Sequence, residues 1–347
     1  MRINTTAELI EQIKNGQFEK IAITTHHKPD GDAMGSTLGL WHILKSLGQN
    51  AQVITPTDYA DFLSWLPGNN SVINFEERID EATTYINGAD LVFCLDFNRL
   101  SRINFLGEII RNRKSQGTKL VMIDHHLEAE EFYNFCFYDT TASSTCELVF
   151  EFAKEYFGTQ SISKDAVNCL YTGLMTDTGN FQHNNTKPHT HRIAAEMMEL
   201  GAEHIQIHQR IYDVFTLNRT RLFGYCMYHK LEIIEDCHTA LIYLSREELD
   251  QFQVVTGDTE GLVNFGLGIK GIVFSVLIID RTERVKMSFR SKGKFAANEF
   301  AGNYFTGGGH FNAAGGQSEE PLERVVEKFR KELVKYKEQL KQIANEL

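Results

Sequence analysis

The first half of the chain alternates short β-rich runs with helical patterns, and this alternation restricts the fold more than any other feature. The apolar runs predict strands at 20–26, 51–56, 91–96, 119–125 and 135–139. The helical patterns between them lie near 33–47, 105–117 and 144–157. Strands that alternate with helices in this way predict an α/β fold, with a mostly parallel sheet that carries crossover helices on both faces.

The rest of the chain predicts a second, smaller α/β domain. The expected elements are a helix that begins after its N-cap Ser163, a helical stretch over 187–232, strands near 238–244, 271–280 and 284–290, a glycine-rich loop at 307–316 and a charged helix from 320 onward. A chain of 347 residues is long enough for two hydrophobic cores. We therefore predict a larger domain at 1–190, a helical linker at 191–232 and a smaller domain at 233–347.

Composition excludes several classes of protein. The longest apolar stretch, 271–279, is too short to span a bilayer, and the N-terminus lacks the pattern of a signal peptide, so we expect a cytoplasmic protein without a membrane partner. The six cysteines form no C-x-x-C pair and most lie in apolar runs, which predicts buried thiols. The formal net charge of -11 argues against binding of long duplex nucleic acid, although the basic run 281–294 could hold a small anion.

Acidic and imidazole side chains follow several predicted strands at the points where the strands end. They are His26, Asp30, Asp32, Asp96, Asp124, His125 and His126, joined by Asp177 just past the helix that ends in "LMT". Ligands of an open parallel sheet bind outside the carboxyl ends of its strands, so we expect these side chains to gather at one edge. A lone aspartate at such a position is usually a turn or helix cap. Independent caps, however, have no reason to recur at the edge where this fold binds ligands.

Metal ions are the simplest explanation for this set. Crowded carboxylates raise one another's pKa unless cations neutralise them. The set exceeds the ligands of one tetrahedral ion, whereas two ions that share a carboxylate form the usual clamp on a phosphate ester. Gly31 allows a tight loop in which Asp30 and Asp32 point to different ions. Two imidazoles among carboxylates favour Mn²⁺ over Mg²⁺, with Co²⁺, Fe²⁺ or Zn²⁺ as substitutes.

Five segments of the sequence carry a resemblance to a known family. They are "HHKPDGDAMGS" at 26–36, "CLDFN" at 94–98, "IDHH" at 123–126, "TDTGNF" at 176–181 and "GGGHFNAAGG" at 307–316. In order, they resemble the signature segments of the DHH phosphoesterase superfamily and of its associated C-terminal domain. The layout is similar to that of the short members that hydrolyse nanoRNA and dephosphorylate 3'-phosphoadenosine 5'-phosphate (pAp). The resemblance implies a parallel-sheet DHH domain, a helical linker and a smaller C-terminal domain, with the active site in the cleft.

The resemblance also implies a role for each matching residue. One metal would be held by His26, Asp30 and Asp96, and the other by Asp32, Asp96, His125 and Asp177, so that Asp96 bridges. His126 would face the substrate phosphate as hydrogen-bond donor or general acid, and Asp124 would orient His125 or His126. The implied substrate-binding positions are Arg102, Arg290, Ser291, Gly308, Gly309 and His310. Asn98 departs from the family pattern, because many members carry a small hydroxyl residue or alanine there.

We therefore expect a metal-dependent phosphoesterase that hydrolyses short RNA or pAp with a water activated between two metals. A phosphodiesterase for linear or cyclic dinucleotides, such as pApA or c-di-AMP, is the enzymatic alternative. A nucleotide-binding sensor that has lost turnover is the non-enzymatic one. The expected partners are short RNA or nucleotides. A homodimer, the preferred substrate and the direction of degradation stay open.

Overall fold

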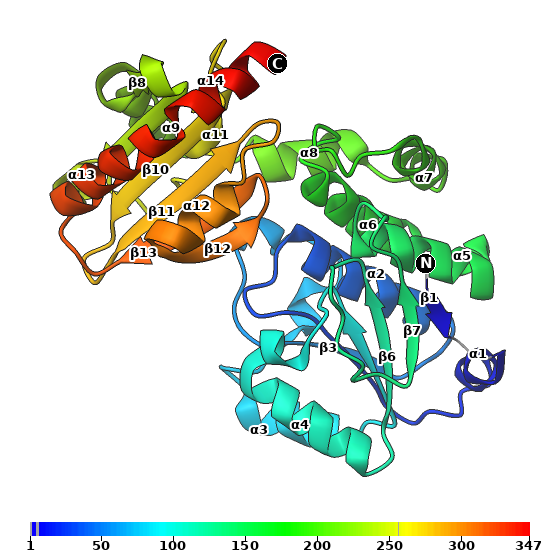
Figure 1. The fold of residues 1–347 in the computed structure, drawn as a ribbon. Helices are drawn as coiled ribbons and strands as arrows, with labels where there is room; N and C mark the ends of the chain where they lie inside the picture. The colour runs from blue at the N-terminus through cyan, green and yellow to red at the C-terminus, as the bar shows by residue number, and fades with distance from the viewer. Residues whose placement is uncertain (1, 5–6, 256) are drawn as a thin grey trace. The chain divides into compact units, whose positions relative to one another are not determined.

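The computed structural model describes residues 2–4, 7–255 and 257–347, and it describes side chains from residue 7 onward. Contacts between residues divide the chain into two units, Met1–Val214 and Phe215–Leu347. The division falls inside the segment 191–232, for which we predicted a linker. Figure 1 shows the elements of both units along the chain.

The first unit is built on a seven-stranded sheet in the order β1-β7-β6-β5-β2-β3-β4. Its strands are β1 (Arg2–Asn4), β2 (Ile21–Thr24), β3 (Ala51–Thr55), β4 (Ile73–Asn74), β5 (Leu91–Leu95), β6 (Lys119–Asp124) and β7 (Phe135–Tyr138). All pairs from β7 to β4 are parallel, and β1 pairs with β7 in the antiparallel sense. The predicted parallel sheet is confirmed. The edge strands β1 and β4 were not predicted, because two or three residues are too few to show a pattern.

Helices cover both faces of this sheet (Figure 1). They are α1 (Ala7–Lys14), α2 (Gly31–Ser46), α3 (Ile79–Asn87), α4 (Asn104–Ser115), α5 (Thr145–Tyr156), α6 (Lys164–Asp177), α7 (Pro188–Glu199) and α8 (His204–Tyr212). One buried core lies between the sheet and α2, α5 and α6, and a second lies against α3 and α4. Ser163 caps α6 as predicted, since its side chain accepts a hydrogen bond from the Ala166 N–H.

Two predictions for the helices need correction. Asp177 is the last residue of α6 and does not lie beyond it, because the chain leaves the helix only at Thr178. The stretch 187–232 is broken: α7 and α8 are separated near Gly201, whose φ of +99° is a left-handed conformation that ends a helix. A further break precedes α9 (Leu217–Tyr225).

Helix α2 packs closely against α6 through a row of glycines. Gly31, Gly35 and Gly39 are spaced by four residues and therefore share one face of the helix. A Cβ at Gly35 would lie 2.5 Å from the Cys169 carbonyl oxygen, and one at Gly31 would overlap the Thr176 side chain. The two helices run antiparallel at this contact, so the first turn of α2 meets the end of α6. This packing brings Asp30 and Asp32 towards Asp177.

The second unit contains a mixed six-stranded sheet in the order β12-β13-β11-β10-β9-β8. Its strands are β8 (Glu232–Ile234), β9 (Thr239–Leu244), β10 (Phe274–Asp280), β11 (Val285–Ser291), β12 (Thr306–His310) and β13 (Ala313–Ser318). Only β9 and β10 pair in parallel. The remaining helices are α10 (Arg246–Gln251), α11 (Leu262–Leu267), α12 (Ala297–Tyr304), α13 (Leu322–Leu333) and α14 (Lys337–Glu346). A smaller α/β domain is thereby confirmed.

The glycine-rich segment 307–316 is not the loop we predicted. It forms the antiparallel pair of β12 and β13, in which Gly307 faces Gly316 and Gly309 faces Ala314. Glycine usually weakens a strand, but here the backbones approach too closely for a side chain. A Cβ at Gly309 would lie 2.7 Å from the Ala313 carbonyl oxygen, and the φ of +141° at this residue also favours glycine. Tertiary contact therefore overrides the local tendency to form a loop.

Two further predictions concern the burial of the cysteines and the absence of a membrane-spanning segment. All six cysteines are buried free thiols, which confirms the burial expected from their apolar neighbours. In the part of the chain that the structure describes, no helix combines the length and the apolar character needed to cross a bilayer.

The close contact between α2 and α6 predicts a specific stability loss. Gly35→Ala should lower the free energy of unfolding by about 1–3 kcal/mol, because the added methyl group forces the two helices apart. Chemical denaturation of the purified protein measures this change. Gly224→Ala on α9 is the matched control, because its Cβ would meet no atom within 4 Å. Equal stability of the two variants would contradict the packing described here.

Candidate metal centre

The predicted acidic and imidazole residues come together at the carboxyl edge of the first sheet. His26 follows β2, Asp96 follows β5, and His125 and His126 follow β6, while Asp30 and Asp32 begin α2 and Asp177 ends α6. Three groups have ligand atoms within 4.8 Å of one another: His26 with Asp30 and Asp96, Asp32 with His125 and Asp177, and Asp96 with His125 and His126. All seven residues belong to the first unit.

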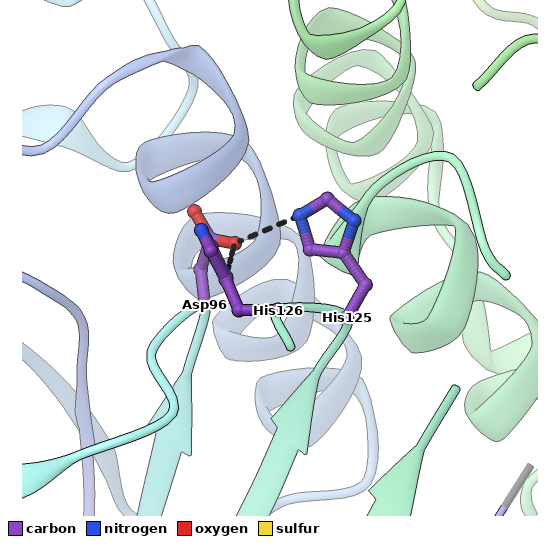
Figure 2. Close-up of side chains that lie close together, drawn as sticks. All are labelled: Asp96, His125 and His126. Carbon is purple, nitrogen blue, oxygen red and sulfur yellow. Dashed lines mark ion pairs between the residues drawn. The ribbon is translucent and has the colours of Figure 1, made fainter. Parts of the chain in front are cut away.

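Asp96 stands at the centre of this cluster. Its Oδ2 lies 3.4 Å from His26 Nε2, whereas its Oδ1 lies 3.6 Å from His125 Nε2 and 3.7 Å from His126 Nδ1. Figure 2 shows the carboxylate between the two adjacent histidines. Asp96 has a φ of 64°, a left-handed conformation that aspartate tolerates better than most residues. The two oxygens thus face different imidazoles, as a bridging carboxylate requires.

Asp30 and Asp32 are held by helix termini, and the tight turn predicted at Gly31 is the start of α2. Asp30 caps α2: its Oδ1 accepts hydrogen bonds from the Asp32 and Ala33 N–H groups, both at 3.0 Å. Its Oδ2 stays 3.8 Å from His26 Nε2. The carboxylate of Asp32, in the first turn of α2, accepts hydrogen bonds from the backbone N–H groups of Thr145 at 2.7 Å and Cys146 at 2.9 Å. Asp30 is therefore a helix cap and remains available as a ligand.

His26 and His125 are oriented as metal-binding histidines commonly are. His26 Nδ1 donates to the His27 carbonyl at 2.9 Å, and His125 Nδ1 donates to the Ala142 carbonyl at 3.4 Å. Each ring thereby turns its Nε2 towards the carboxylates: His125 Nε2 lies 3.7 Å from Asp177 Oδ2 and 3.9 Å from Asp32 Oδ2. A backbone carbonyl that fixes one ring nitrogen leaves the other free to bind a metal.

His126 is oriented differently. Its Nδ1 donates to Asp124 Oδ1 at 2.8 Å, so Asp124 orients His126, which selects between the two alternatives left by the sequence. Burial lowers the pKa of His126, but the hydrogen bond to Asp124 and the charge of Asp96 outweigh burial, and the pKa is raised. Arg102 lies near enough for its charge to oppose this shift. With Nδ1 committed to Asp124, the ring has Nε2 left for another partner.

The carboxylates repel one another strongly. Burial, with the charges of Asp96 and Asp177, raises the pKa of Asp32 well above its usual range. Burial and the charges of Asp96 and Asp30 raise the pKa of Asp177 to about 7, against the opposing effect of His125. For Asp96, burial is outweighed by the hydrogen bond and charge of His26 and by the charges of His125 and His126, so its pKa is lowered. Asp32 and Asp96 are only 1% and 2% exposed.

This donor set fits divalent metal ions. Among the described residues, no lysine or arginine forms an ion pair with Asp32, Asp96 or Asp177, so histidines are the only basic side chains paired with them. Mixed oxygen and imidazole donors suit divalent transition metals. Asp96 belongs to two of the three groups, which suits a pair of ions. The site therefore has the ligands and the unbalanced negative charge that divalent cations require.

The predicted substrate-binding residues of the second unit occupy β11 and β12. Arg290 is half-buried and donates from Nη1 to the Phe289 carbonyl at 2.9 Å. Burial lowers its pKa. The Ser291 hydroxyl is used inside the domain, since it donates to the Phe295 carbonyl at 2.6 Å and accepts from Asn312 Nδ2 at 2.8 Å. His310 is exposed at the end of β12, and a Cβ at Gly308 would meet open space.

Sequence reasoning missed several residues that support the centre. Thr145 and Cys146 hold Asp32, and the Asn185 side chain donates to the carbonyls of Ser143 and Asp177. Nothing in the sequence distinguished these small polar residues from ordinary helix caps. Asn98, noted as a departure, donates to the Leu127 carbonyl at 2.6 Å and so ties the loop after β5 to the loop after His126.

Comparisons with known proteins agree with this geometry. The model of the DHH family, N-terminal domain, matches residues 20–174, and the DHHA1 domain model matches residues 240–339. A Thermus thermophilus protein named bifunctional oligoribonuclease and PAP phosphatase NrnA is 30% identical over 96% of this chain and 95% of its own length. The chain belongs to the DHH family.

Two further relatives and one solved structure are similar to this chain over most of its length. The Bacillus subtilis protein of the same name, NrnA, is 28% identical over 89% of this chain and 91% of its own length. A cyclic-di-AMP phosphodiesterase, PdeA, from Listeria monocytogenes is 24% identical over 90% of this chain, which spans 47% of that relative. The solved structure of an exopolyphosphatase-related protein from Bacteroides fragilis has a TM-score of 0.91 and 38% identity, and the match covers 96% of this chain and 97% of that one.

Because Asp96 lies at the centre of the cluster, we expect its replacement to reduce both metal binding and catalytic rate. Asp96→Asn keeps the shape of the side chain and tolerates the left-handed backbone, but it removes the charge shared by two candidate groups. Bound divalent metal should fall to a small fraction of the wild-type content. Catalytic rate should drop by more than about 100-fold, since loss of a mere outer-shell partner costs 10–100-fold. Elemental analysis and circular dichroism measure metal content and folding, and a folded variant with full metal content would contradict the central role.

Proposed function

We propose that this chain is a two-metal phosphoesterase that releases mononucleotides from very short RNA and removes a phosphate from pAp. The observation that carries the proposal is the meeting of four aspartates and two Nε2-directed histidines at one sheet edge. The relatives named as oligoribonucleases and PAP phosphatases, matched over most of their length, support the same chemistry.

The metal ligands in this proposal are the members of two of the three groups whose ligand atoms lie close together. His26, Asp30 and Asp96 would hold one ion, and Asp32, His125 and Asp177 would hold the other with Asp96 shared. Bound divalent cations supply Lewis-acid stabilisation of phosphoryl oxygens and lower the pKa of water. We take Mn²⁺ as the working ion, because imidazole ligands suit it better than Mg²⁺.

The protein's own residues orient the substrate. His126, held by Asp124 through Nδ1, presents Nε2 for a hydrogen bond or proton transfer to a phosphoryl oxygen. The nearby Arg102 adds positive charge for the same phosphate. Asp124 is fully buried, so it holds the His126 ring without itself contacting the substrate.

The second unit carries a candidate receptor for a phosphate group. Within the described residues, no carboxylate forms an ion pair with Arg290, although this guanidinium is half-buried. Burial lowers the pKa of Arg290 against the opposing charge of Glu260. A half-buried guanidinium that forms no ion pair favours an anionic ligand, which arginine can bind through two parallel hydrogen bonds. His310 and the open backbone at Gly308 would add donors, while Ser291 would keep Asn312 and the β11 end in place.

Metal replacement tests the donor set. Activity on pAp that is lost to a chelator should return best with Mn²⁺ and less with Mg²⁺ at equal concentration, because imidazole donors suit Mn²⁺. Initial rates after dialysis and metal addition measure this preference. Full recovery with Mg²⁺ alone would contradict the roles of His26 and His125 as ligands.

Arg290→Ala tests the phosphate receptor. The loss of charge-assisted hydrogen bonds worth about 1.5–3 kcal/mol should reduce kcat/KM for pAp by about 10- to 100-fold. An aryl phosphodiester without a second phosphate should be affected much less, and metal content should not change. Arg324→Ala is the control, because this arginine is exposed and pairs with Glu327 on α13. An equal loss on both substrates, or a loss of metal, would contradict the receptor role.

A substrate panel decides among the candidate activities. Rates on pAp, pApA, c-di-AMP and RNA of two to five nucleotides should show the highest kcat/KM for short RNA or pAp. The Listeria relative's name supports the dinucleotide alternative, and a clear preference for pApA or c-di-AMP would establish it in place of the main proposal. Tight nucleotide binding without turnover in Mn²⁺ would instead indicate a sensor.

A further inference from the structure

Thr145 contacts two of the central carboxylates at once. It is the first residue of α5 and is fully buried. Its hydroxyl donates to Asp96 Oδ1 at 2.8 Å, and its backbone N–H donates to Asp32 Oδ2 at 2.7 Å. It therefore connects the residue after β5 to the first turn of α2, although these lie 49 and 113 positions away along the chain.

The Thr145 hydroxyl is not needed to begin the helix. Ser144 already caps α5, since its hydroxyl accepts a hydrogen bond from the Glu147 N–H at 3.0 Å. The N–H groups of Thr145 and Cys146, which also lie at this helix end, are satisfied by Asp32. The hydroxyl of Thr145 is thus directed at Asp96 and serves no capping role.

This hydroxyl bonds one oxygen of the Asp96 carboxylate, while His26 lies near the other. The terminal torsion of an aspartate is soft and broad, so the carboxylate rotates easily unless a neighbour fixes it. The bond from Thr145 reaches the oxygen that faces His125 and His126, and Oδ2 is then left facing His26. The two oxygens are therefore kept on different sides of the cluster.

We propose that Thr145 is a positioning residue, whose hydroxyl fixes the Asp96 carboxylate so that each oxygen serves a different metal ion. The proposal rests on the two-metal function above. It assigns to Thr145 no contact with substrate. A residue of the same shape without a hydroxyl should leave the fold intact and weaken metal binding, as loss of an outer-shell hydrogen bond does elsewhere.

Calorimetric titration of the metal-free full chain with Mn²⁺ tests this role without measuring activity. Thr145→Val should raise the Mn²⁺ dissociation constant by about 10- to 100-fold. Thr145→Ser, which restores the hydroxyl, should bind Mn²⁺ nearly as tightly as the wild type. At saturating Mn²⁺, kcat of Thr145→Val should recover substantially, and KM for pAp should change little.

Thr118→Val is the matched control. Thr118 is also buried and donates its hydroxyl to a backbone carbonyl, that of Ala89, but it precedes β6 at the opposite edge of the sheet. The Thr118→Val variant should bind Mn²⁺ with the affinity of the wild type. Equal weakening in both valine variants, or unchanged affinity in folded Thr145→Val, overturns the proposal for Thr145. If Thr145→Val does not fold, Thr145→Ala is compared with Thr145→Ser in the same titration.

The outcomes separate this inference from the function on which it rests. A wild-type chain that binds no Mn²⁺ overturns the two-metal function and with it the role of Thr145. A wild-type chain that binds two ions, together with a valine variant that does the same at equal affinity, overturns only the role of Thr145.

Discussion

The crowding of Asp32, Asp96 and Asp177 is the constraint on which the rest of the structure depends. Buried carboxylates are costly to ionise, and their mutual repulsion raises the pKa of Asp32 and of Asp177. The fold offsets this cost with groups of opposite polarity. The N-terminus of α5 donates to Asp32, and three imidazoles surround Asp96. The proposed divalent cations would neutralise the unbalanced charge that remains.

Close helix packing makes this crowding possible. The glycines of α2 allow α6 to approach until its last residue, Asp177, lies beside the carboxylate of Asp32 and the ring of His125. The close approach of the two helices therefore decides whether Asp177 joins the cluster. A wider separation would leave Asp177 outside the cluster and would reduce both the repulsion and the number of ligands.

Glycines also shape the second unit, where they allow two strands to pair closely. Glycines in β12 and β13 let two backbones pair closely and leave an open surface above Gly308. Arg290, on the neighbouring strand β11, pairs in register with Ala313 of β13. His310 of β12 also pairs in register with Ala313, so Arg290 and His310 face each other across β13.

The sequence by itself determined the α/β class, the parallel sheet and the acidic and imidazole residues that gather at one edge, because strand periodicity is local and parallel strands must end at one common edge. It did not determine the pairing of β12 with β13, the capping role of Asp30 or the partner of Asp124, since each depends on which backbone or ring lies opposite. Thr145 shows the difference most clearly. Its position before an apolar helical run identifies a helix start, but its contact with Asp96 arises only when the sheet and α5 pack together. Local sequence patterns indicate which helix or strand a segment can form. Only tertiary packing decides which polar atoms come into contact.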